Sequence, residues 1–246
     1  HISSKSSVGQ VLLKPGSIMA AVDEFRIDLT GAQTHGSTPW TGIDPIVTAS
    51  QMINSIQTIV SRSMPLTTAA AVVTIGSIHG GVRSNIIPEK LYMLGTIRTL
   101  DNSMRATVLT RLDEIVQNVA AANNVKAEVT FMNSYPVTYN DPELYEKMLP
   151  TLIRVCGADN VNYMDAITGA EDFSFFQKEV PGVYFFIGGT SKGMDLDKVA
   201  PHHTPDFYVD DSALETRFPY LRRLRQDLAQ SNLVFALIFF STPTIS

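Results

Sequence analysis

Cysteine and charge are both scarce in this sequence. Cys156 is the single cysteine among 246 residues, which excludes an intramolecular disulfide and a Cys-x-x-Cys zinc site. Charged residues make up 17% of the chain, and 24 acidic against 19 basic residues give a net charge of −5, so nothing favours a nucleic-acid partner. The most apolar run, residues 233–240, is far shorter than the ~20 residues that span a membrane. We therefore expect neither nucleic acid nor a membrane as a partner; a small polar substrate suits the composition better.

No localisation signal can be read from the N-terminal residues. The sequence starts at His1 without a methionine, a basic segment or an apolar leader-like segment, so we expect further protein upstream. Localisation stays open, with the cytoplasm as the default and export as the alternative.

The chain contains enough apolar residues for folded cores, because 44% of it is hydrophobic. That content allows one large domain or two modest ones. Between residues 23 and 134, strand and helix patterns follow one another in the order β-α-β-β-α-β. This order is the split βαβ pattern, in which two helices pack on one face of an antiparallel four-stranded sheet. The expected strands are 24–29, 69–78, 91–100 and 127–132.

Both expected helices have clear start signals. Asp44 is a good N-cap with Pro45 at the first helical position, and Asp101 offers a cap for the second helix. Apolar residues then recur at helical spacing, which predicts one buried face on each helix. In the first helix these residues are Ile46, Ala49, Ile53, Ile56 and Val60.

Residues 135–246 follow a different pattern and are expected to belong to a second, α/β domain together with residues 1–22. A helix begins after Asp141 and ends at Gly157. We expect a strand at 183–187, a turn at Gly188-Gly189 and a helix from about Asp211. The predicted division is therefore 1–22, 23–134 and 135–246.

Histidine is the residue type that could carry metal chemistry, but no local metal motif such as His-Glu-x-x-His is present. Any metal site must be assembled from distant loops. His203 stands between prolines in Pro-His-His-Thr-Pro, where it could be presented to a ligand or be an ordinary loop residue. His35 lies in the small-residue loop Gln-Thr-His-Gly-Ser-Thr-Pro-Trp, either as a substrate-facing group or as a locally bonded turn residue.

Four further polar residues allow both a structural and a functional interpretation. Arg98 lies in an expected strand, where arginine is usually solvated. Asn85 could be a turn former. Glu171 and Asp172 could be metal ligands or a general base, or simply acidic residues at a helix N-terminus.

Six ordered blocks of the sequence resemble the amidohydrolases of the M20 peptidase family, the group of hippurate hydrolases, N-acyl-amino-acid deacylases and auxin-conjugate hydrolases. They include Gly-Gly-Val-Arg-Ser-Asn (80–85), Gly-Thr-Ile-Arg-Thr-Leu (95–100), Gly-Ala-Glu-Asp-Phe-Ser (169–174) and His-Thr-Pro (203–205). The other two blocks lie at 9–21 and 34–46. The resemblance implies a ferredoxin-like lid domain that mediates homodimerisation, and part of a zinc-peptidase-like α/β catalytic domain.

The resemblance also implies roles for residues. His1 and His203 would be ligands of a centre of two divalent metal ions, which could be zinc, manganese, nickel or cobalt. His35 would reach an active site, typically that of the partner subunit, and polarise the scissile carbonyl. Asn85 and Arg98 would hold the substrate carboxylate. Glu171 matches a position in the active-site wall.

The implied activity is hydrolysis of the amide bond of N-acyl amino acids or small peptide-like amides. The family supplies further metal ligands from a His-x-Cys-Gly-His-Asp segment and a Glu-Glu pair, and neither occurs in this sequence. We therefore expect the chain alone to be inactive and the activity to belong to a longer parent. The alternative is a non-catalytic dimerisation or ligand-binding module derived from the family. A third interpretation, an RNA-binding ferredoxin-like domain, is disfavoured because the lid strands are mostly aliphatic.

Overall fold

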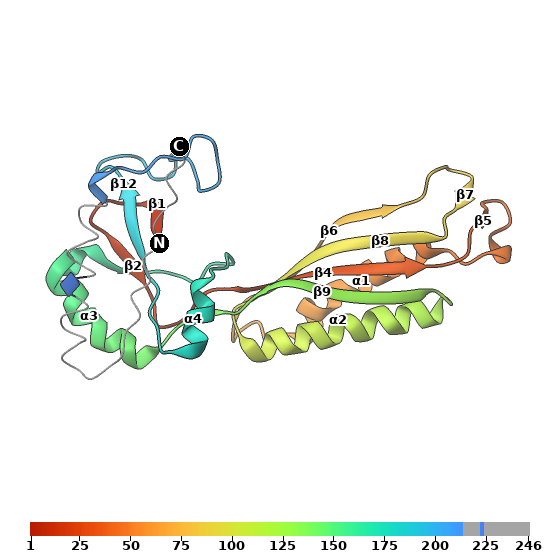
Figure 1. The fold of residues 1–246 in the computed structure, drawn as a ribbon, viewed down its shortest axis with the longest axis horizontal. Coiled ribbons are helices and arrows are strands. Elements are labelled where there is room, and N and C mark those ends of the chain that lie inside the picture. The colour runs from red at the N-terminus through yellow and green to blue at the C-terminus, as the bar shows by residue number, and fades with distance from the viewer. Residues whose placement is uncertain (214–221, 224–246) are drawn as a thin grey trace. The chain divides into compact units, whose positions relative to one another are not determined.

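A computed structural model describes residues 1–213 and 222–223 (Figure 1). The apolar run at 233–240 lies outside the described residues, as does most of the helix expected from Asp211. The chain divides into two compact units. The lid unit comprises residues 17–139 and 166–180, and the mixed-sheet unit comprises residues 1–16, 140–165 and the described residues from 181 onward. Among the described residues, no helix has the length and apolar character needed to cross a membrane.

The lid unit is built on an antiparallel four-stranded sheet in the order β6-β8-β4-β9. Two helices cover one face of this sheet (Figure 1). This arrangement confirms the predicted split βαβ fold. The elements are β4 (Ala21–Thr30), α1 (Pro45–Ser63), β6 (Ala71–Gly80), β8 (Lys90–Thr99), α2 (Asn102–Ala122) and β9 (Lys126–Tyr135).

The two helices begin where the sequence predicts. The Asp44 side chain accepts hydrogen bonds from the backbone N–H groups of Ile46 and Val47, and that of Asp101 accepts one from Met104. The core takes Ala49, Met52, Ile56 and Ile59 from α1, and Val108, Leu112, Val116 and Ala120 from α2. Ile46, expected in the buried stripe, is 44% exposed instead.

A buried ion pair joins three elements at one end of the lid sheet. Asp23 on β4 is only 2% exposed, and the Arg105 guanidinium on α2 donates to both of its carboxylate oxygens at 2.7 Å. Ser134 on β9 donates to the same carboxylate at 2.8 Å. The hydrogen bond that Arg105 donates to Asp23 raises the pKa of the Arg105 guanidinium. This bidentate geometry fixes the start of α2 against the sheet.

Short elements complete the lid unit. Strands β5 (Thr34–His35) and β7 (Ile86–Ile87) pair with each other. The 3₁₀ turn η1 (Pro39–Thr41) follows β5, and helix α4 (Phe173–Glu179) comes from the later segment of the chain. Strands β3 (Gly16–Met19) and β10 (Thr138–Asn140) form another small sheet.

The mixed-sheet unit contains a sheet in the order β1-β12-β2-β11, with α3 packed on it. The pairs β1·β12 and β2·β11 are parallel, whereas β12 and β2 are antiparallel. Asp141 caps α3 through a bond from the Leu144 N–H, as predicted, and α3 ends before Gly157. The bounds are β1 (Ile2–Ser7), β2 (Val11–Leu13), α3 (Pro142–Cys156), η2 (Ala158–Asn160), β11 (Val161–Tyr163) and β12 (Phe186–Thr190).

The turn predicted at Gly188-Gly189 is wrong. Both glycines lie inside β12 and are buried. A Cβ atom on Gly188 would overlap the carbonyl oxygen of Ser7, so glycine is required there for close approach of β1 and not for chain reversal.

Two glycines of the lid sheet give a matched test of its packing. A Cβ on Gly95 would overlap the Phe25 ring and the Thr74 carbonyl oxygen, whereas a Cβ on Gly76 would have the Leu94 oxygen at 4.0 Å as its nearest neighbour. We expect Gly95→Ala to lower the free energy of unfolding by about 1–3 kcal/mol through overpacking. Gly76→Ala should change it by less than about 0.5 kcal/mol. Urea denaturation of both variants measures this, and equal losses would contradict the packing described.

Candidate functional site

His35 and Asn85 lie together at one end of the lid unit. His35 pairs with Ile86 in the β5·β7 ladder, and the Gly36 N–H donates to the Asn85 carbonyl oxygen at 2.8 Å. A Cβ on Gly36 would lie 3.2 Å from that oxygen, so the two loops can approach this closely because residue 36 is glycine. His35 and Asn85 are both exposed. The sequence separates them by fifty positions, and the short ladder brings them to one place.

The hydrogen bonds of His35 fix its tautomer. The Ser37 N–H lies 3.1 Å from Nδ1, and the Ser37 hydroxyl lies 2.7 Å from the same atom. Because a backbone N–H can only donate, Nδ1 is the acceptor, and the neutral ring carries its proton on Nε2. The exposed imidazole can therefore present an Nε2–H donor to a carbonyl oxygen.

Arg98 lies at the opposite end of the lid sheet from His35. It stands on β8 between Val22 of β4 and Val72 of β6. It is eight residues along the strand from Lys90, which comes three residues after the end of β7, and this separation is roughly 27 Å at the rise of an antiparallel strand. Within one lid unit, Arg98 and His35 therefore cannot contact the same small molecule.

Glu171 belongs to the Arg98 end of the lid unit. The Ala20 N–H is within hydrogen-bonding distance of the carbonyl oxygens of Ile167 and Gly169, which holds the segment before Glu171 against the start of β4. Glu171 is half-buried, and its carbonyl oxygen accepts from the Ser174 hydroxyl at 2.7 Å.

The neighbouring carboxyl of Asp172 is perturbed by Glu171. A hydrogen bond between the two side chains, together with partial burial and charge repulsion, raises the pKa of Asp172. Asp172 is therefore protonated more readily than an isolated aspartate.

The mixed-sheet unit gathers three histidines. The rings of His1 and His202 have centroids 5.5 Å apart, and those of His202 and His203 are 6.4 Å apart. His202 Nε2 accepts a hydrogen bond from the Ser4 N–H at 3.3 Å, and its ring lies 4.7 Å from that of Phe207. Burial, with a smaller effect of His203, lowers the pKa of His202. His203 has a left-handed backbone with φ 63°, rare for a non-glycine residue.

These histidines do not by themselves fit a centre of two metal ions. Within residues 1–213 and 222–223, no group of three or more His, Cys, Asp or Glu side chains is placed to hold a metal. A catalytic zinc usually takes three protein ligands. Further ligands would have to come from outside the described part of the chain.

The structure thus brings His35 to Asn85, Arg98 to the same end of the lid as Glu171, and His1 to His202. Sequence reasoning gave no role to Ser37 or His202. The i to i+2 spacing of His35 and Ser37 in a glycine-containing loop was the available signal for the first. No sequence signal indicated the role of His202, because its contacts with Ser4 and His1 join residues far apart in the sequence.

Comparison with known proteins identifies the lid. Residues 22–124 match the model of the M20 peptidase dimerisation domain. The uncharacterised hydrolase y4tI of Sinorhizobium fredii is 36% identical over 214 residues, covering 87% of this chain and 52% of the relative. The N-acetyl-L-cysteine deacetylase of Bacillus subtilis is 33% identical over 236 residues, covering 94% of this chain and 53% of the relative.

A solved structure agrees with these relatives. The YXEP protein of Bacillus subtilis, described as a dinuclear metal-binding peptidase of the M20 family, superposes with a TM-score of 0.75 at 26% identity, covering 95% of this chain and 56% of that one. The chain spans about half the length of the curated relatives that it matches. On these grounds the chain belongs to the M20 peptidase family and contains its dimerisation domain.

Proposed function

We propose that this chain serves the hydrolysis of the amide bond of N-acyl amino acids or small peptide-like amides, as part of a longer M20 amidohydrolase. The observation that carries the proposal is the exposed Nε2–H of His35, held beside Asn85 at the lid end and locked in its tautomer by Ser37. The deacetylase among the relatives supports the acyl amino acid class. The activity requires two divalent ions, zinc, manganese, nickel or cobalt, with some ligands from outside this chain.

Each candidate residue has a role in this proposal. His35 donates from Nε2 to the scissile carbonyl oxygen, where negative charge develops. Arg98 binds the substrate carboxylate through its planar guanidinium fork, and Asn85 adds an amide donor. Glu171, with Asp172, forms part of the wall of the site. His1 and His203 are metal ligands, and His202 holds its ring beside His1.

The proposal requires a homodimer in which one active site uses both subunits. Since His35 lies beyond the Lys90 end of β8 and Arg98 lies roughly 27 Å from Lys90 along that strand, a substrate bound by Arg98 receives its His35 from the partner. Exposed apolar side chains on elements near His35 suit such an interface. They are Trp40 and Val82, which are 79% and 85% exposed, and Ile46, Val47 and Ile78.

Subunit complementation tests the shared site. The chain is used in place of the corresponding part of the Bacillus subtilis deacetylase, and hydrolysis of N-acetyl amino acids by this chimera is measured. We expect His35→Ala and Arg98→Ala each to lower kcat/KM at least about 100-fold, the scale for loss of one preorganised donor. Equimolar mixing of the two variants should restore about a quarter of the activity, because random heterodimers contain one intact site.

The control for this experiment is Arg26→Ala, which removes another lid arginine that is paired with Asp28 on β4. It should leave the activity of the chimera unchanged. Mixing it with another variant should therefore give no activity beyond the average of the two proteins. If the mixed His35 and Arg98 variants stay inactive while gel filtration shows heterodimers, the two residues do not share a site across the interface and the proposed geometry is wrong.

A second function, binding of N-acyl amino acids without turnover, is favoured by one observation. The described residues contain no cluster of three or more metal-ligand side chains. In that case the chain retains the lid and its dimer surface but no catalytic centre. Under both functions the described residues alone hold no complete metal centre.

Metal stoichiometry therefore distinguishes these functions from an active isolated chain. After incubation with zinc or manganese and desalting, we expect well under one ion per chain by inductively coupled plasma mass spectrometry, because three protein ligands are usually needed for tight binding. His203→Ala should not change that value. Two ions retained per chain, lost in His203→Ala, would instead make this chain a complete metal centre.

A further inference from the structure

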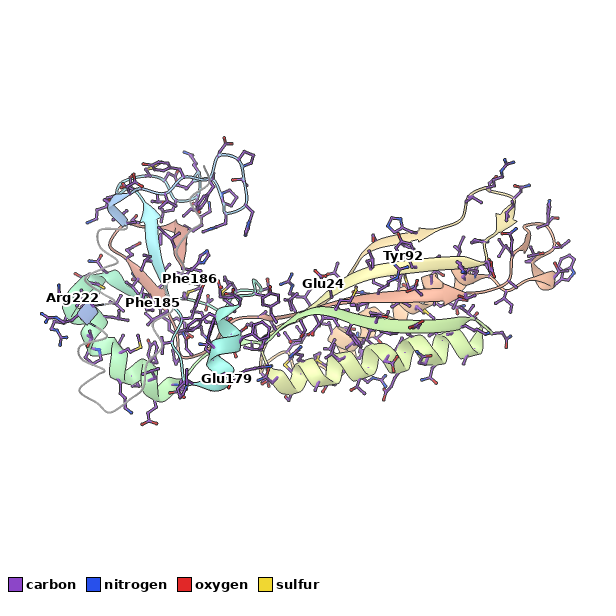
Figure 2. All side chains as sticks on the ribbon, viewed as in Figure 1. Glu24, Tyr92, Glu179, Phe185, Phe186 and Arg222 are labelled. Carbon is purple, nitrogen blue, oxygen red and sulfur yellow. The ribbon has the colours of Figure 1, made fainter. Side chains whose placement is uncertain are left out.

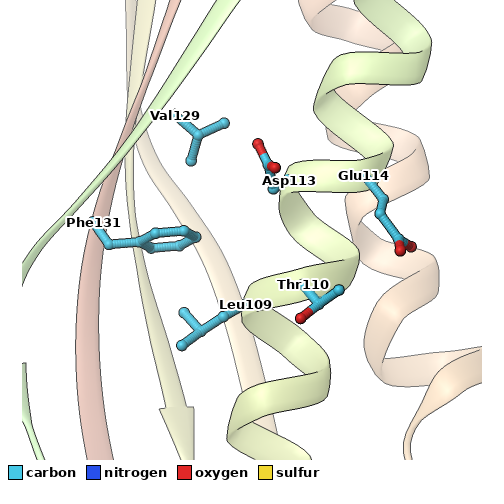
Figure 3. A pocket seen from close by; sticks show the side chains of 6 residues that line it. All are labelled: Leu109, Thr110, Asp113, Glu114, Val129 and Phe131. Atoms are coloured by element: carbon cyan, nitrogen blue, oxygen red, sulfur yellow. The ribbon is translucent and has the colours of Figure 1, made fainter.

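A groove runs between helix α2 and strand β9 on the side of the lid unit (Figure 3). Its volume is about 430 Å³, and it is lined by Leu109, Thr110, Asp113, Glu114, Val129 and Phe131. Leu109 and Val129 pack on the lid core and form its apolar lining. Phe131, although it pairs with the buried Phe25 across β4, is 40% exposed because the groove leaves its ring uncovered. The groove has no part in the function proposed above.

Strand β9 is the outer strand of the lid sheet at this groove. It follows β4 in the order β6-β8-β4-β9 and has no further partner strand among the described residues. An outer strand presents unpaired N–H and C=O groups to which another extended chain can add. Charged residues protect only the start of β9, at Lys126 and Glu128. The stretch from Val129 to Met132 carries no charge, so backbone pairing is open beside the groove.

One carboxylate gives the groove its charge preference. Asp113 points from α2 toward the sheet and the Phe131 ring, whereas Glu114 points away from it (Figure 3). Glu114 is paired with Arg111 on its own helix. Asp113 accepts a hydrogen bond from Gln117 and has no ion pair with any described residue. A cation lying between this carboxylate and the Phe131 ring would gain a charge pair and a cation–π contact.

We propose that the groove binds an extended peptide segment carrying a lysine or arginine, which adds to β9 as a fifth strand. The apolar stem of that side chain packs on Leu109 and Val129, and its cationic head reaches Asp113 and the Phe131 ring. Backbone hydrogen bonds to β9 supply the alignment. The partner is therefore a protein with an exposed basic, β-forming segment, and it binds independently of the amidohydrolase site.

Nuclear magnetic resonance on the ¹⁵N-labelled chain tests this site. The probe is a blocked peptide of alternating valine and threonine with one central arginine, and the comparison peptide has glutamate in its place. We expect the arginine peptide to shift the amides of β9 and to bind more weakly as salt is added. The glutamate peptide should bind at least about tenfold more weakly.

Two neighbouring variants provide the control. Asp113→Lys should weaken binding of the arginine peptide about tenfold, while Glu114→Lys, with the same change in charge on the same helix, should leave it within about twofold. Circular dichroism checks that both variants are folded. Equal weakening by both variants, or shifts outside β9 and α2, would overturn the proposal. A dimer of the chain that Asp113→Lys dissociates would also overturn it, because the groove would then belong to a second copy.

Discussion

The lid unit depends on burial of one face of its sheet beneath α1 and α2. Phe25, Ile27 and Met93 project from that face into a core completed by the two helices. Hydrophobic burial of this kind requires the strands to pair in a single register, since a shift by one residue would turn every apolar side chain outward. Gly95 shows how closely the layers meet, because the Phe25 ring occupies the space where a Cβ would lie.

The same constraint decides where polar chemistry can be placed. The face opposite the helices is free of core packing. There lies Tyr92, which is labelled in Figure 2. The Arg26 guanidinium stacks 3.9 Å from the Tyr92 ring centroid, and His79 stacks on the same ring with the two centroids 4.8 Å apart. Arg26, His79 and Tyr92 all lie on strands of the lid sheet, so contacts within the sheet stabilise this face. His35 and Asn85 lie instead beyond one end of the sheet, at the short β5·β7 ladder and its loops, whereas Arg98 is a strand residue near the other end.

Much of the fold could be predicted because its signals are local. Asp44, Asp101 and Asp141 cap helices through bonds to residues two or three positions later, and such bonds depend on neighbours in sequence. Gly188 was misinterpreted because a turn and a close strand contact both require glycine, and only the position of Ser7 decides between them. Pairing of His1 with His202 likewise arises from sheet contacts far apart in sequence, and no local pattern encodes it.

The two units differ in how far apart in the sequence their core residues lie. The lid core is drawn from a continuous segment, from Phe25 to Val129, so its loops close at modest entropic cost. The core of the mixed-sheet unit combines Val11 and Leu13 with Leu152 and Ile187, and its β1·β12 pair joins segments about 185 residues apart in sequence. The whole lid segment must therefore be crossed before that core can close, whereas the lid core closes on residues of its own segment.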